Sequence, residues 1–136
     1  MEVLEFPDTR SGKMVKAALS CNTNEWSFGM VVANDEVFSV LLPRLSSDMF
    51  EDHCLAFDIV SILGHTVFAG KPKPGQEDAV KSVLEESLET YKQQVSFYPA
   101  GQMSAEGAQI GITNDGYCYF VIHENGAEIA DAMTQA

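Results

Sequence analysis

Residues 76–95 have the sequence QEDAVKSVLEESLETYKQQV, in which apolar side chains recur every three or four positions. This spacing places them along one side of an α-helix, with charged side chains on the other side. The apolar positions are Ala79, Val80, Val83, Leu84, Leu88, Tyr91 and Val95. The charged positions are Glu77, Asp78, Lys81, Glu85, Glu86, Glu89 and Lys92. The sequence therefore predicts an amphipathic helix over 76–95 that buries one face and exposes an acidic one.

Segments on both sides of this helix predict β-hairpins, because their side chains follow the period of two that is typical of strands. The first hairpin spans 25–42 and turns at Asn34-Asp35. The second spans 109–123 and turns at Asn114-Asp115-Gly116, where glycine supplies the positive φ that a tight or bulged turn needs. The apolar residues of segment 3–6 predict a further short strand.

Two other segments are each compatible with a helix or a strand. Asp48 followed by Glu51 is a capping-like pair, and the apolar residues after it predict a helix that extends to residue 63. Apolar side chains also alternate here, so buried strands over 55–63 and 66–69 are the alternative. Segment 14–21 fits a short helix or a strand equally well.

Proline and glycine mark the breaks between these elements. Residues 70–75 read GKPKPG and predict a connector through which neither a helix nor a strand continues. The tripeptide at 99–101, PAG, ends the central helical region, and Asn125 with Glu128 opens a short C-terminal helix. We therefore predict a single acidic α+β domain over 1–136, with a mostly antiparallel sheet built from hairpins. Two helices cover one face of this sheet, and the short C-terminal helix follows them.

The charge balance is strongly acidic. The 136 residues include 20 Asp and Glu against eight Lys and Arg, which gives a net charge of −12 at pH 7. Such a surface repels nucleic acids and anionic membranes, so we expect neither as a partner. It attracts a basic protein, although an acidic surface that only keeps the protein soluble is the alternative. The predicted docking residues are Glu85, Glu86 and Glu89 of the 76–95 helix, together with Asp48, Glu51 and Asp52.

The sequence contains no recognisable catalytic or metal motif. His53 and Cys54 are neighbours, and neighbouring side chains on a helix diverge, so they do not form a base and nucleophile pair. Asp48, Glu51, Asp52 and His53 gather several metal-ligating groups, but a hard cation prefers about six or more oxygen ligands. We therefore predict no metal site and no cofactor.

The cysteines and the N-terminal residues indicate the compartment. Cys21, Cys54 and Cys118 are an odd number at spacings that fit neither a disulfide framework nor a C-x-x-C pair. The N-terminal residues lack the basic and apolar regions of a secretion signal, and no apolar stretch is long enough to span a membrane. We therefore expect a cytoplasmic protein with free thiols.

The leading functional hypothesis is a non-enzymatic acidic module that binds a basic protein. In size and charge alone, the chain is similar to acidic proteins that neutralise a basic target, such as immunity proteins against nuclease toxins, which implies an inhibitor-type role. One alternative is a small enzyme or small-molecule binder that uses Cys54 or a histidine in a pocket. Another is an acidic chaperone for a secreted protein, which would form a homodimer and expose an apolar patch.

Overall fold

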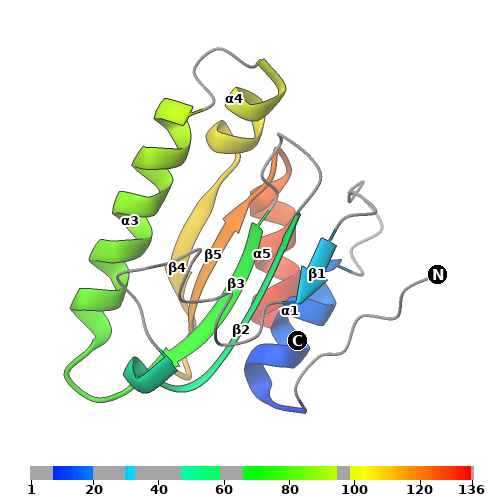
Figure 1. Ribbon diagram of the computed structural model, residues 1–136. Helices are drawn as coiled ribbons and strands as arrows, with labels where there is room; N and C mark the ends of the chain where they lie inside the picture. Colours follow the sequence, from blue (N-terminus) through cyan, green and yellow to red (C-terminus); the bar gives the residue numbers. More distant parts are fainter. Residues whose placement is uncertain (1–7, 20–29, 33–46, 59–65, 95–98, 136) are drawn as a thin grey trace.

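The computed structural model of the protein describes residues 8–19, 30–32, 47–58, 66–94 and 99–135. Figure 1 shows the arrangement of their helices and strands. The helices are α1 (Arg10–Leu19), the 3-10 turn η1 (Ser47–Met49), α3 (Glu77–Gln94), α4 (Pro99–Glu106) and α5 (Gly126–Gln135). The strands are β1 (Met30–Val32), β2 (Phe50–Asp58), β3 (Thr66–Pro72), β4 (Gln109–Ile112) and β5 (Cys118–Ile122).

The strands form one antiparallel sheet in the order β1-β2-β3-β5-β4. Phe68 of β3 lies at its centre, opposite Leu55 of β2 on one side and Phe120 of β5 on the other. Strand β5 is therefore inserted between β3 and β4, and β4 lies at one end of the described sheet. The predicted α+β class with an antiparallel sheet is confirmed.

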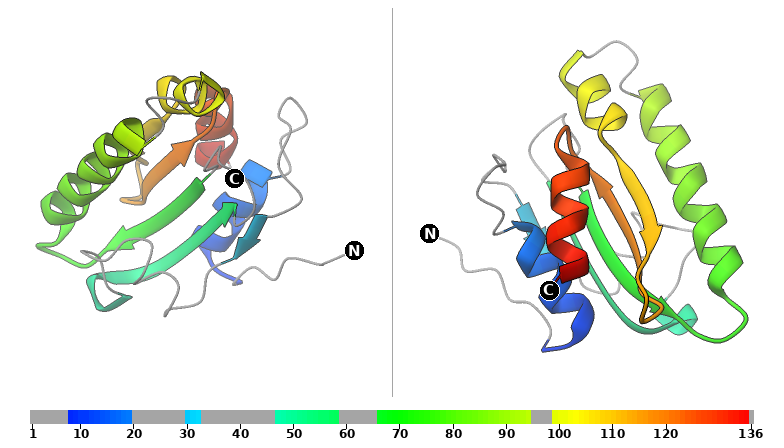
Figure 2. Two further views of the ribbon diagram at one scale, coloured as in Figure 1. Left: turned by 45° about the horizontal axis from the view of Figure 1, so that its top comes forward. Right: turned by 180° about the vertical axis from the view of Figure 1, so that it is seen from behind.

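Alternate residues of the strands are buried on opposite faces of the sheet, as the strand geometry requires. Helix α3 covers one face, where it packs against Phe50, Leu55, Phe68, Cys118, Phe120 and Ile122. Helices α1 and α5 cover the other face, where they pack against Cys54, Ala56, Val67, Ala69 and Val121. Figure 2 shows α1 and α5 side by side across the sheet from α3. The prediction that helices cover only one face is wrong, because the strands of this sheet are apolar on both.

The central helix and the second hairpin are confirmed. Helix α3 lies within the predicted 76–95 segment, and its buried residues Val80, Val83 and Leu84 belong to the predicted apolar side. In the hairpin, Gly116 has a φ of +88°, and the Thr113 N–H donates to the Tyr117 carbonyl at 2.8 Å. The C-terminal helix is also confirmed, and α5 extends to Gln135.

The helix predicted from Asp48 is wrong. Strand β2 begins at Phe50, directly after the turn η1. Leu55 faces α3, whereas its neighbours Cys54 and Ala56 face α1 and α5. Because both faces of β2 are buried, apolar residues occupy consecutive positions and mimic a buried helix. The alternative of two strands is confirmed for residues 55–58 and 66–69, and residues 59–65 lie outside the described parts.

The predicted connector at 70–75 begins too early. Strand β3 continues to Pro72, and the chain turns afterwards, with Gly75 at a φ of +90°. Gly70 lies within the strand. A side chain is disfavoured there, because a Cβ atom would come within 2.7 Å of the Phe68 ring and 3.0 Å of the Phe50 ring. The glycine that suggested a break instead makes room for two aromatic rings of the core.

Two helical segments also differ from the prediction. Pro99 begins α4 rather than ending a region, which suits a residue without an N–H because the first turn of a helix leaves its N–H groups unpaired. The helical alternative for segment 14–21 is correct for its described part, but α1 starts earlier, at Arg10. Thr9 caps this helix, since its Oγ1 accepts a hydrogen bond from the Gly12 N–H at 3.4 Å.

Part of the N-terminal prediction lies outside the described residues. This applies to the strand over 3–6 and to most of the hairpin over 25–42. Within the latter, Met30–Val32 form β1, and Val31 lies opposite Phe57 of β2.

Candidate functional site

An open groove of about 740 Å³ runs along α3 beside β4. It is lined by Ser82, Glu85, Glu86, Leu88, Glu89, Thr90 and Ile110. The three glutamates are exposed because they lie off the apolar side of α3. Leu88 and Ile110 are partly buried and pack against the core cluster beneath the helix. The structure thus brings the predicted acidic residues of α3 together in a depression to which Leu88 and Ile110 contribute apolar side chains.

A smaller cavity of about 180 Å³ adjoins this groove at Ile110, which lines both. Its other lining residues are Glu77, Asp78, Lys81, Leu84, Gly111, Ile112 and Cys118. Glu77 and Asp78 add two exposed carboxylates, and Lys81 adds one positive charge. We call the two depressions together the α3–β4 groove. Acidic side chains therefore border this groove along most of α3.

The positive charges of α3 offset only part of this acidity. Lys92 forms an ion pair with Glu89 at 3.5 Å, as their spacing of three residues allows. Both side chains are exposed, at 46% for Lys92 and 69% for Glu89. Such exposed pairs contribute little stability and keep both charges accessible to solvent. The groove therefore presents a net negative charge to a partner.

Sequence reasoning missed the contribution of β4 to this groove. Ile110 and Ile112 were predicted only as strand residues, although Ile112 is 58% exposed. Their approach to α3 depends on the insertion of β5 between β3 and β4. Local patterns contain no signal for this insertion. The two isoleucines in the strand offered the one hint of an apolar surface.

The other predicted docking residues do not form one acidic patch. Asp48 is exposed in η1, and Glu51 lies at an irregularity of the β2–β3 pairing, 3.8 Å from the Lys71 ammonium group. Asp52 turns inward, to the sheet face that α1 covers. These residues do not share a helical turn, because the chain continues from the 3-10 turn η1 into strand β2. Among the described residues, no cluster of three or more acidic, histidine or cysteine side chains is arranged to hold a metal ion.

Asp52 joins three elements that are distant in the sequence. Its carboxylate accepts hydrogen bonds from the Ser11 N–H at 2.9 Å, the Ser11 hydroxyl at 2.7 Å and the Tyr117 hydroxyl at 3.0 Å. Arg10 adds a nearby ion pair with Asp115 at 3.1 Å. These contacts tie the first turn of α1 to β2 and to the turn between β4 and β5. Asp52 is therefore partly buried and has a structural role in joining these elements.

These contacts determine the protonation of the site. Burial raises the pKa of Asp52, but hydrogen bonds from Ser11, Thr9 and Tyr117 outweigh it, and the pKa falls below the ordinary value of 3.8. Burial and the hydrogen bond to Asp52 raise the pKa of Tyr117 to about 12. At neutral pH the carboxylate is therefore charged, and the phenol keeps the proton that it donates.

Replacing Asp52 with alanine should lower the free energy of unfolding by about 1–3 kcal/mol at pH 7, because Ser11 and Tyr117 lose their acceptor. Since the pKa of Asp52 is lower in the folded state, its contribution is complete above the unfolded value of about 3.9 and disappears as the pH falls through the folded value. Urea unfolding of wild type and variant as a function of pH measures the difference. The exposed Asp48→Ala variant is the control. An Asp52→Ala loss that stays constant down to about pH 3 would contradict the role of the charge.

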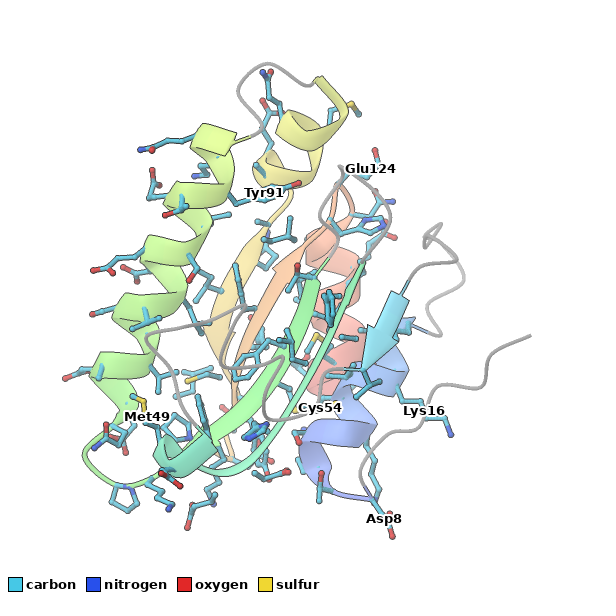
Figure 3. All side chains as sticks on the ribbon, viewed as in Figure 1. Asp8, Lys16, Met49, Cys54, Tyr91 and Glu124 are labelled. Carbon is cyan, nitrogen blue, oxygen red and sulfur yellow. The ribbon has the colours of Figure 1, made fainter. Side chains whose placement is uncertain are left out.

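Three residues of the alternative enzyme hypothesis, Cys54, His53 and His123, lie in the described parts of the chain. Cys54 is buried between the sheet and α1 (Figure 3). Burial and the nearby charge of Asp52 raise the pKa of its thiol to about 12, so little reactive thiolate exists at neutral pH. His53 lies on the opposite face of β2, against the ring of Phe50. His123 is fully buried, and its Nδ1 accepts a hydrogen bond from the Asn125 N–H at 3.0 Å.

Comparisons with known proteins found no matching family model, no similar curated protein and no similar solved structure. Within the described parts of the chain, the helices are too short or too polar to cross a membrane.

Proposed function

We propose that the protein is a non-enzymatic binding module that docks on a basic protein through the α3–β4 groove. The observation that supports this most directly is the position of Glu85, Glu86 and Glu89, which border a depression lined by the apolar side chains of Leu88 and Ile110. Protein interfaces commonly combine an apolar centre with a polar periphery. This groove has both features at the scale of a few side chains.

Charge and apolar contact have different effects on such a complex. The net charge of −12 and the acidic border attract Lys and Arg over distances near the Debye length, which increases the association rate. Apolar contact with Leu88 and Ile110 slows dissociation, because apolar surface is removed from water. Partner selection through charge is the behaviour expected of an inhibitor or immunity-type protein that neutralises a basic target.

A cytoplasmic location is part of this proposal. Cys54 and Cys118 are free and buried, and burial raises the pKa of the Cys118 thiol as well as that of Cys54. Thiols of this kind persist in a reducing compartment without forming disulfides. The proposed partner is therefore a basic protein encountered in the cytoplasm.

Reversing two groove charges, in the Glu85→Lys/Glu89→Lys variant, should reduce the association rate with the basic partner by about tenfold or more at low salt. The partner is first isolated by affinity capture on the wild-type protein and then purified. Its association rate with each variant is measured over a series of salt concentrations. The wild-type rate should fall as salt increases, because salt screens the attraction, whereas the rate of the variant should fall less steeply.

A matched control separates the groove from net charge. The Glu124→Lys/Asp131→Lys variant changes the net charge by the same amount at exposed positions outside the groove. Figure 3 shows Glu124 far from α3, and Asp131 lies on α5, which covers the opposite face of the sheet. The control should keep most of the wild-type rate. Equal rates for both variants at every salt concentration would show that the partner does not use this groove.

A further inference from the structure

Strand β4 leaves its outer edge unpaired in the described sheet, since β5 is its only strand neighbour there. The Thr113 N–H donates to the Tyr117 carbonyl, which sets the hydrogen-bonding phase of the hairpin. Opposite residues of antiparallel strands alternate between pairs that exchange backbone hydrogen bonds and pairs that do not. The backbone groups of Gly111 and Gln109 therefore bond to β5. The N–H and C=O groups of Ile110 and Ile112 then point away from the sheet. Four backbone groups of β4 therefore have no strand partner within the described part of the chain.

Among the residues that the structure describes, this edge lacks the features that normally prevent strand pairing. Proteins protect sheet edges with charged side chains, proline, bulges or a covering segment. The sequence of β4 is QIGI, with no charged residue and no proline, and its pairing with β5 is regular. Within the described residues, no hydrogen bond caps the outward groups of Ile110 or Ile112. The outward N–H and C=O groups of this edge can therefore form hydrogen bonds with an added strand.

The side chains of the same two isoleucines line the α3–β4 groove. Side chains alternate between the two faces of a strand, so every second side chain of a strand added beside β4 would lie on the α3 face. Those side chains would meet Glu85, Glu86 and Glu89 at one cavity, and Glu77 and Asp78 at the other. Lysine or arginine at alternate positions would complement the negative charge of both cavities. At the smaller cavity, the two carboxylates of Glu77 and Asp78 outnumber the one positive charge of Lys81.

We propose that the basic partner binds by adding an extended segment to the free edge of β4, with Lys or Arg at alternate positions facing α3. This inference rests on the proposed function and specifies how that groove recognises its partner. Backbone hydrogen bonds to Ile110 and Ile112 would supply affinity, and the acidic border would supply selectivity, as in other cases of β-strand addition.

A second copy of the chain is the competing occupant of this edge. Pairing two β4 edges around a two-fold axis would bring the acidic sides of both α3 helices toward the same interface. Each copy carries a net charge of −12, so two paired copies repel each other. A basic segment is instead attracted to the acidic border of the groove. Charge therefore favours the partner segment over the second copy.

The test uses the full-length protein and a peptide of about eight residues in which Lys and Val alternate. Hydrogen exchange followed by NMR should show that the peptide slows exchange of the Ile110 and Ile112 amides, while the already paired Gly111 amide changes little. A peptide with Glu in place of Lys should not bind. Binding of the Lys peptide without protection of these two amides would overturn the proposal.

Two variants of Ile112 separate the contribution of its backbone N–H to binding from that of its side chain. Ile112→Pro removes an outward N–H without removing a bond to β5, and Ile112→Ala keeps that N–H. The proline variant should bind the Lys peptide about tenfold more weakly than the alanine variant. Equal binding by the two folded variants would show that no backbone bond forms at Ile112.

The outcomes also separate this inference from the proposed function. If the Glu85→Lys/Glu89→Lys variant loses the captured partner but the edge amides remain unprotected, the groove binds the partner without strand addition. If that variant keeps the partner, the proposed function itself fails. Protection of Ile110 and Ile112 without peptide, together with a dimeric mass that rises with concentration, would assign the edge to a second copy.

Discussion

Replacing Phe68 with alanine should lower the free energy of unfolding by about 3–5 kcal/mol. Phe68 is fully buried at the centre of the sheet, and its ring contacts that of Phe50 edge to face, with centroids 5.5 Å apart. It also lies between Leu55 and Phe120 on the adjacent strands. Removing the ring leaves a cavity within the cluster that side chains of β2, β5 and α3 form around Phe68.

Denaturant unfolding of wild type and the Phe68→Ala variant measures this loss. Ile112→Ala is a suitable control, because it removes a large apolar side chain that is 58% exposed. The control should cost about 1 kcal/mol or less, since little burial is lost. A Phe68→Ala loss no larger than that of the control would mean that the centre of the core lies elsewhere.

Leu84→Ala should destabilise the protein by about 2–5 kcal/mol through lost burial and the cavity that remains. Leu84 is fully buried under α3, and it also lines the smaller cavity of the α3–β4 groove. The variant should therefore weaken the attachment of the helix that carries the groove acids. Urea unfolding measures the loss, and the exposed Gln93→Ala change on the same helix is the control. Equal stability of the two variants would show that the buried side of α3 is assigned incorrectly.

The difference between α3 and β2 explains which elements could be predicted from sequence. Helix α3 buries one side only, so its apolar residues recur with the helical period and its glutamates fall on the exposed side. Strand β2 is buried on both faces, so Cys54, Leu55 and Ala56 form a continuous apolar run without period. The capping-like Asp48 and Glu51 then favoured a helix that tertiary burial overrides.

Long-range contacts explain the limits of the site prediction. The acidic border of the groove was predictable because it lies on one helix. The contribution of Ile110 was not, because this residue reaches α3 only through the insertion of β5 between β3 and β4. Asp52 was interpreted as a surface acid because its partners Ser11 and Tyr117 lie 41 and 65 residues away along the chain. No local pattern distinguishes such an internal acceptor from an exposed carboxylate.

Hydrogen–deuterium exchange of the full-length protein, with and without the captured basic partner, tests the proposed binding site most directly. Binding through the α3–β4 groove predicts slower exchange in residues 82–90 of α3, with unchanged exchange in α1 and α5. Strand addition at the edge of β4 further predicts slower exchange at Ile110 and Ile112. Protection confined to α1, α5 or the surface around Asp48, with none along α3 and β4, would contradict binding at this groove.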